Sequence, residues 1–147
     1  MTPEDVALFS GLSHAYGPAD DIPALLDDLA GDDWDMALDE LWGSILHQGT
    51  IYPATLPAMR HIARIAAEPL PGRAAAMELA LGFSRSMAFT SGVLPYLPEG
   101  TDPEAFGDEA RAVLVEITGV IAPLLADDDP EIRLGAADFL AYARPGE

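Results

Sequence analysis

The chain contains no cysteine and no lysine among its 147 residues, and all seven of its Lys+Arg positions are arginine. The lack of cysteine excludes a disulfide framework, a thiol nucleophile and a cysteine-ligated zinc, and it fits a reducing compartment. No apolar run is long enough to cross a membrane, since the best candidate, residues 113–126, is short and contains Glu116. Glu4 and Asp5 stand where a signal peptide carries positive charge, so we expect a cytoplasmic protein.

Basic charge is also scarce, because 25 acidic residues face seven basic ones and give a formal net charge of −18. Every acid from Glu4 to Glu40 precedes the first basic residue, Arg60. Such a surface repels nucleic-acid phosphates and anionic membranes, because binding either requires basic side chains. It attracts a basic protein partner and speeds their encounter. Acidity also serves solubility alone, and the sequence leaves both interpretations open.

The apolar residues recur with a helical period nearly everywhere, and no window alternates as a strand does. Half of the residues are hydrophobic, which suffices for one domain with a buried core. The pattern predicts an all-α fold in a single domain, residues 1–147. It comprises a lead helix through Phe9 and three helical hairpins over about residues 20–48, 53–91 and 102–144.

Start and stop signals place the helices within these hairpins. Asp102 before Pro103, and Asp129 before Pro130, have the pattern of an N-cap followed by proline at the first helical position. Gly31 and Gly49 are predicted to end helices in the first hairpin. The predicted helices cover about residues 22–30, 32 or 33 to 49, 54–67, 73–91, 103–126 and 130–143.

The first and last hairpins share a layout, in which apolar residues precede an acidic turn and an alanine is followed four residues later by leucine. Recurrence of this kind is typical of an array of stacked repeats. The segment Leu124-Leu125-x-Asp127-x-Asp129-Pro130-Glu131-Ile132-Arg133-x-x-Ala136-Ala137-x-x-Leu140 resembles a HEAT repeat. The resemblance implies a short right-handed α-α superhelix of the HEAT or ARM type, in which a turn aspartate and an arginine of the second helix form a ladder between repeats.

Asp127 or Asp129, together with Arg133, match the positions of that ladder. The middle hairpin supplies Arg73 at looser spacing, whereas the first hairpin has Trp34 near the arginine position. A second segment, Leu41-Trp42-x-x-Ile45-x-His47-Gln48-Gly49-Thr50-x-Tyr52, is similar to one in bacterial HEAT-repeat-like proteins. Both resemblances imply a fold and a scaffold role rather than an activity.

His47, Gln48 and Tyr52 form the most distinctive polar cluster, at the predicted end of a helix. One interpretation is a ligand or partner site. The other, which we favour, is structural: Gly49 takes a left-handed cap conformation, His47 and Gln48 bond to the last carbonyls, and Tyr52 packs across the turn.

The remaining candidates have structural alternatives as well. Asp32, Asp33 and Asp35 are paired carboxylates that suit a divalent cation or acid–base chemistry, but they also suit a helix start. The histidines have no metal-ligand spacing, and the serines lack a nucleophile motif. Trp34 and Trp42 are predicted either as core or as an exposed binding hot spot.

The sequence therefore predicts a non-enzymatic protein-interaction module, without cofactor or metal, that binds a possibly basic protein partner. An immunity-type acidic inhibitor of a basic toxin, such as a nuclease, is a sharper form of the same hypothesis. A metal-dependent enzyme that uses Asp32 to Asp35 and His47 is the alternative from another class. No nucleic-acid or membrane partner is expected, and self-association through an end face is compatible with the short array.

Overall fold

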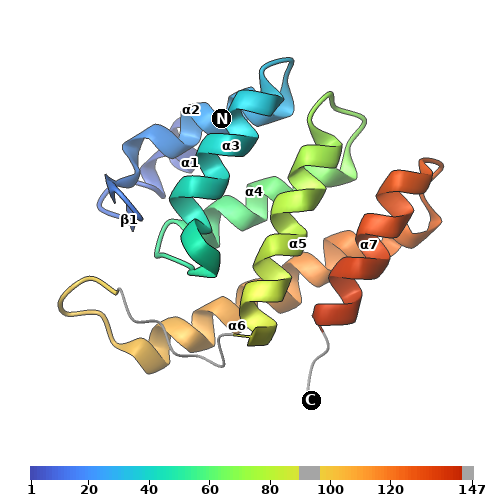
Figure 1. The fold of residues 1–147 in the computed structure, drawn as a ribbon. Helices are drawn as coiled ribbons and strands as arrows, with labels where there is room; N and C mark the ends of the chain where they lie inside the picture. The colour runs from blue at the N-terminus through green and yellow to red at the C-terminus, as the bar shows by residue number, and fades with distance from the viewer. Residues whose placement is uncertain (90–96, 144–147) are drawn as a thin grey trace.

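The computed structural model describes residues 1–89 and 97–143, and most of them are helical (Figure 1). The all-α prediction is thereby confirmed, although residues 90, 91 and 144, at the predicted ends of two hairpins, lie outside the described ranges. The helices are α1 (Pro3–Ala7), α2 (Ile22–Ala30), α3 (Trp34–Ile45), α4 (Thr55–Ala67), α5 (Arg73–Phe89), α6 (Pro103–Ile121) and α7 (Pro130–Tyr142).

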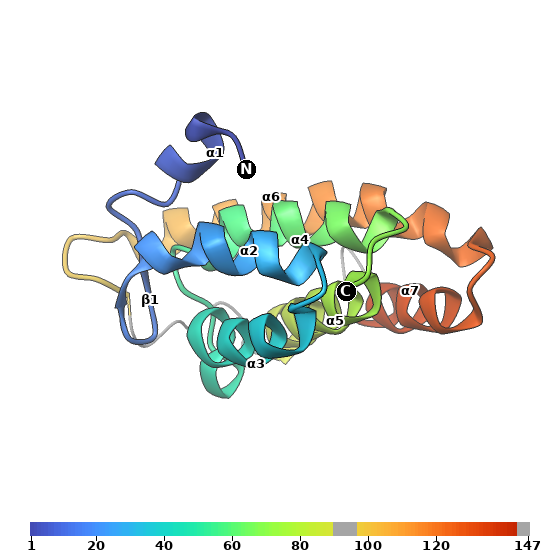
Figure 2. The same ribbon diagram turned by 90° about the horizontal axis from the view of Figure 1, so that it is seen from above.

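The six longer helices form two layers, which Figure 2 shows from above. One layer holds α2, α4 and α6 in that order, and the other holds α3, α5 and α7. Each helix of the first layer is followed in the sequence by one of the second, so that α2 packs on α3 and α4 packs on α5. The core lies between the layers, where Leu29, Leu41, Ile62, Phe83 and Phe139 are fully buried.

Two glycines bring neighbouring hairpins into close contact. A methyl group added at Gly72, just before α5, would lie 1.6 Å from the carbonyl oxygen of Leu29 in α2. A methyl group added at Gly82 in α5 would lie 2.8 Å from the ring of Trp42 in α3. Because the obstacle at Gly72 is backbone, no larger residue fits there, and the first and second hairpins meet at a distance that only glycine permits at this position.

The predicted helix starts of the last hairpin are confirmed. Asp102 accepts a hydrogen bond from the N–H of Glu104 at 3.0 Å, and Asp129 accepts one from the N–H of Glu131 at 2.9 Å. The predicted end of the first of these helices is wrong, because α6 ends at Ile121 and a 3-10 segment, η3 (Ala122–Ala126), follows. Pro123 provides the reason, since proline has no N–H to continue the α-helical hydrogen bonds.

The beginning of the chain differs more from expectation. Thr2 and Asp5 form a capping box around α1, which ends at Ala7, and Phe9 is buried just beyond it. A two-stranded antiparallel ribbon then pairs β1 (Ser13–His14) with β2 (Gly17–Pro18), where no strand was predicted. These strands have two residues each, so they are too short to show an alternating pattern.

The predicted helix end at Gly31 is confirmed, because α2 ends at Ala30 and Gly31 is its C-cap. The backbone of Gly31 is extended, with φ −108° and ψ −157°. Asp33 occupies the N-cap position of α3, but its side chain makes no capping hydrogen bond. The predicted end of this helix at Gly49 is wrong, because α3 ends at Ile45, where Leu46 leaves the helical conformation (φ −131°, ψ 25°), and a separate 3-10 turn, η2 (His47–Gly49), leads to the loop before α4.

Candidate functional site

One exposed stripe of α3 combines acidic and aromatic side chains. Asp35, Asp39 and Trp42 follow the spacing i, i+4, i+7, which places them on the same side of the helix. The opposite side of α3 is buried through Ala37, Leu41 and other core residues. We call the exposed surface formed by Asp32, Asp33, Trp34, Asp35, Asp39 and Trp42 the α3 face.

The two tryptophans of the α3 face are neither core nor free surface. Trp34 retains 38% of its exposure and Trp42 retains 44%, whereas Phe139 is fully buried. The ring of Trp42 rests against Gly82 of α5, and Trp34 begins α3 beside Gly72. The Trp42 indole is therefore packed on one side by α5 and open to solvent on the other, whereas at Trp34 it is the Cβ that lies beside Gly72.

The carboxylates of the α3 face have no cation against them within the described ranges. Ion pairs in residues 1–89 and 97–143 use other acids, such as Asp27 with the chain's amino terminus and Glu116 with Arg60. Asp35 accepts a hydrogen bond only from the N–H of the next residue, Met36, at 2.9 Å. The α3 face consequently presents uncompensated negative charge around two half-exposed rings.

The end of α3 is held by a residue that the sequence did not single out. The hydroxyl of Thr55, which is fully buried, donates to the carbonyl oxygen of Ile45 at 2.6 Å and accepts from the N–H of Tyr52 at 2.8 Å. The left-handed conformation predicted for Gly49 is confirmed, with φ 77°. Capping of the last carbonyls by His47 and Gln48 is wrong for Ile45, because Thr55 provides its partner.

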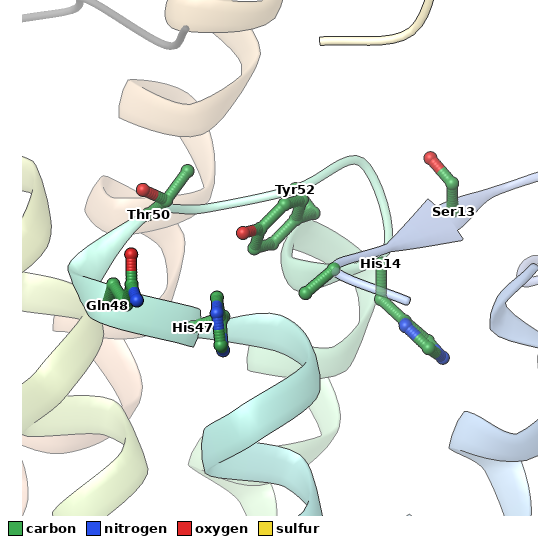
Figure 3. A pocket seen from close by; sticks show the side chains of 7 residues that line it. Ser13, His14, His47, Gln48, Thr50 and Tyr52 are labelled. Atoms are coloured by element: carbon green, nitrogen blue, oxygen red, sulfur yellow. The ribbon is translucent and has the colours of Figure 1, made fainter. Parts of the chain in front are cut away.

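A pocket of about 320 Å³ lies beside this turn (Figure 3). Figure 3 shows Tyr52 between Thr50 and His14, with His47 and Gln48 on the adjoining turn. Tyr52 is buried, as predicted, and Gln48 is exposed. Three segments of the chain line the pocket through Ser13, His14, Ala15, His47, Gln48, Thr50 and Tyr52.

Backbone hydrogen bonds fix these three segments to one another. The N–H of Ala15 donates to the carbonyl of Ser44 at 2.9 Å, and the N–H of Ala54 donates to the carbonyl of Ser13 at 3.1 Å. The short β ribbon is thus tied both to the end of α3 and to the start of α4. Sequence analysis missed this half of the pocket, although Gly17-Pro18 signals a turn there.

The two histidines of the pocket have different roles. His14 Nδ1 accepts from the N–H of Tyr16 at 3.1 Å, so in the neutral ring Nε2 carries the proton and donates to Asp21 at 2.9 Å. His47 Nδ1 lies 3.4 Å from the hydroxyl of Tyr16, and their rings meet edge to face. Both nitrogens of His14 are therefore engaged in structure, whereas His47 has a contact only at Nδ1 among the described partners.

The residues of the metal-enzyme hypothesis do not come together. Asp35 and His47 are separated by the length of α3, which is about 18 Å for its 12 residues. Within residues 1–89 and 97–143, no group of three or more histidine, aspartate or glutamate side chains is arranged to hold a metal ion. Asp32, Asp33 and Asp35 lie at the start of α3, as predicted.

The predicted ladder residues are in contact with different partners than expected. Arg73, at the start of α5, donates to Asp127 at 2.9 Å and to the carbonyl oxygen of Ala66 at 3.0 Å. Arg133 instead donates to the main-chain carbonyls of Asp127 and Asp128. The pairing between hairpins thus runs from Arg73 to Asp127, whereas Arg133 holds its own turn and Asp129 caps α7.

Asp127 is stabilised in its charged form by these contacts. The N–H of Asp129, at 3.0 Å, is the main cause that lowers the pKa of Asp127 below 3.8, and the Arg73 guanidinium lowers it further.

The pKa of His61, in α4, is also lowered, but mainly by burial. Burial lowers the pKa of His61 below 6.5, Arg64 lowers it further, and Asp5 of α1, at 3.8 Å, opposes the shift.

No protein-family model, curated protein or solved structure matches the chain. None of the helices within residues 1–89 and 97–143 is long and apolar enough to span a membrane. The α3 face and the pocket at the end of α3 are therefore the two candidate functional surfaces of the described residues.

Proposed function

We propose that this chain is a short HEAT-like α-α superhelix that acts as a protein-interaction module for a basic partner. Three features support the superhelix: the two alternating helix layers, the close approach at Gly72, and the bond between Arg73 and Asp127. That bond joins the second helix of one hairpin to the turn of the next, which is the ladder position of the resembled family. The lack of cysteine supports a reducing compartment such as the cytoplasm.

The α3 face is the observation on which the partner's chemistry depends. Tryptophan is enriched among residues that dominate binding energy, and both Trp34 and Trp42 are partly exposed, with the ring of Trp42 packed against Gly82. The carboxylates of Asp35 and Asp39 place negative charge beside the two tryptophans, and none of the described basic residues pairs with these carboxylates. An amphipathic segment with apolar residues between arginine or lysine side chains complements both properties.

An immunity-type inhibitor of a basic toxin is the special case in which that segment belongs to an enzyme that binds nucleic acid. The same acidic surface would then cover the toxin's phosphate-binding residues. In this case the module would inhibit the toxin by binding alone and would catalyse no reaction itself.

The test is a titration with two labelled 17-residue helical peptides, one of leucine and arginine and one of leucine and glutamate, followed by fluorescence anisotropy. We expect binding of the basic peptide only, with affinity that falls as salt is raised. The double variant D35N/D39N should weaken it about thirtyfold, since each of the two lost contacts with a close charge contributes on the order of 1 kcal/mol.

The matched control is E99Q/E109Q, which removes the same charge from two exposed acids outside the α3 face. We expect the control to change affinity less than twofold. Equal weakening by both double variants would show that net charge alone attracts the peptide, and this result would overturn the α3 face as the binding site.

A further inference from the structure

The pocket at the end of α3 is outside the α3 face, and the proposed function leaves its role open. Its volume of about 320 Å³ exceeds the size of one amino-acid side chain. Its walls are fixed by main-chain hydrogen bonds from Ala15 to Ser44 and from Thr50 to His47. The space is therefore a built part of the fold, and a partner side chain could enter it without rearranging the backbone.

The chemistry of the walls suits a planar group that donates several hydrogen bonds. The hydroxyl of Thr50 and the amide oxygen of Gln48 are acceptors, and the rings of His47 and Tyr52 provide flat surfaces (Figure 3). None of the residues that line the pocket carries a carboxylate or a guanidinium. An incoming group therefore meets neutral acceptors and rings, which is the environment on which guanidinium stacks.

The electrostatic potential around the pocket determines whether a cationic or an anionic group can bind there. The carboxyl-terminal end of a helix carries a partial negative charge of about half an elementary charge, and the pocket lies at that end of α3. The whole chain adds a net charge of −18. Both contributions disfavour a phosphate or carboxylate in the pocket and favour a cation.

Gln48 supplies an independent observation. Its φ is 53°, which lies in the left-handed region, and it is the sole residue other than glycine with positive φ in the described ranges. Glycine would adopt this conformation without strain, and a side chain retained there costs about 1 kcal/mol. The amide of Gln48 is thus kept at the rim of the pocket against the local preference of the backbone.

We propose that this pocket receives the guanidinium of an arginine from the basic partner, an inference that rests on the proposed function. Gln48 and the hydroxyl of Thr50 accept its hydrogen bonds, and His47 provides a stacking surface. Lysine, whose ammonium is compact and strongly hydrated, would use the same pocket poorly.

The experiment compares two labelled 17-residue peptides that differ only in having arginine or lysine at every basic position. Anisotropy gives their affinities for the wild-type chain and for Q48G and H47A. We expect the arginine peptide to bind about tenfold more tightly than the lysine peptide. Q48G should remove this preference and leave the lysine peptide's affinity unchanged.

Thermal unfolding separates this role from a structural one. Q48G relieves the left-handed strain, so its melting temperature should equal or exceed that of the wild type. Equal wild-type affinities for the two peptides, or an arginine preference that survives in either Q48G or H47A, would overturn the inference and leave the proposed function standing. Failure of both peptides to bind the wild type would overturn the proposed function as well.

Discussion

The contact between Gly72 and Leu29 gives the sharpest prediction about how the hairpins stack. In the variant G72A, the new methyl carbon would lie 1.6 Å from the carbonyl oxygen of Leu29. An ordinary carbon–oxygen contact is about 3.3 Å, so the start of α5 and the end of α2 must separate by roughly 1.7 Å. The obstacle is backbone rather than a flexible side chain, and it cannot move aside by a rotamer change.

We expect G72A to lose at least about 3 kcal/mol of unfolding free energy, at the upper end of overpacking costs. For a chain of this size, the loss corresponds to a melting temperature lower by roughly 10 °C. Differential scanning calorimetry and urea unfolding followed by circular dichroism measure both quantities.

The matched control is G119A, the same one-methyl change in α6 at a position with nothing within 4 Å. Alanine is a better helix former than glycine, so G119A should gain roughly 0.5–1 kcal/mol. The two variants thus differ in the sign of their effect. If G72A proved as stable as G119A, the first and second hairpins would not meet at Gly72, and the stacking described above would be refuted.

Three further predictions concern single contacts. T55V leaves the carbonyl of Ile45 and the N–H of Tyr52 without their buried hydroxyl partner, so the unfolding free energy measured in urea should fall by about 2–3 kcal/mol. An unchanged urea midpoint would show that Thr55 does not stabilise the end of α3. D127N should be less stable than the wild type at neutral pH. This difference in unfolding free energy should disappear as the pH falls from 3.8 through the lowered pKa of Asp127, because the wild-type carboxylate is then protonated in the folded state as well. A difference that stays constant down to pH 2 would contradict the contact between Arg73 and Asp127. Because burial lowers the pKa of His61, the unfolded chain binds a proton at this residue more readily than the folded chain, so the stability should fall as the pH drops below 6.5. H61Q should reduce this dependence of the melting temperature on pH. An equal dependence in H61Q and in the wild type would show that other groups cause it.

Long amphipathic helices with capping signals could be predicted from the sequence. Asp102 and Asp129 cap helices where expected, because an aspartate before proline serves a local function that depends on few distant residues. The end of α6 was missed because the apolar stripe continues through the 3-10 segment after Pro123, and periodicity alone does not distinguish the two helix types.

Features that depend on distant parts of the chain could not be predicted. The hydroxyl of Thr55 reaches Ile45 across a turn, and Arg73 at the start of α5, rather than Arg133, pairs with the carboxylate of Asp127. The pocket joins the β ribbon to the end of α3, segments that lie about thirty residues apart in the sequence. The sequence singled out His47, Gln48 and Tyr52, but it contained no signal that Ser13 and His14 would face them.

Acrylamide quenching of tryptophan emission shows whether a partner docks on the α3 face, because both tryptophans of the chain lie on this face. Trp34 and Trp42 are 38% and 44% exposed, so the quencher reaches both in the free protein. Saturation with the leucine–arginine peptide should lower the quenching constant about twofold, as the partner covers the open side of each indole. Peptide that binds by anisotropy while the quenching constant stays unchanged would show that the partner docks elsewhere, and it would contradict the α3 face as the site of recognition.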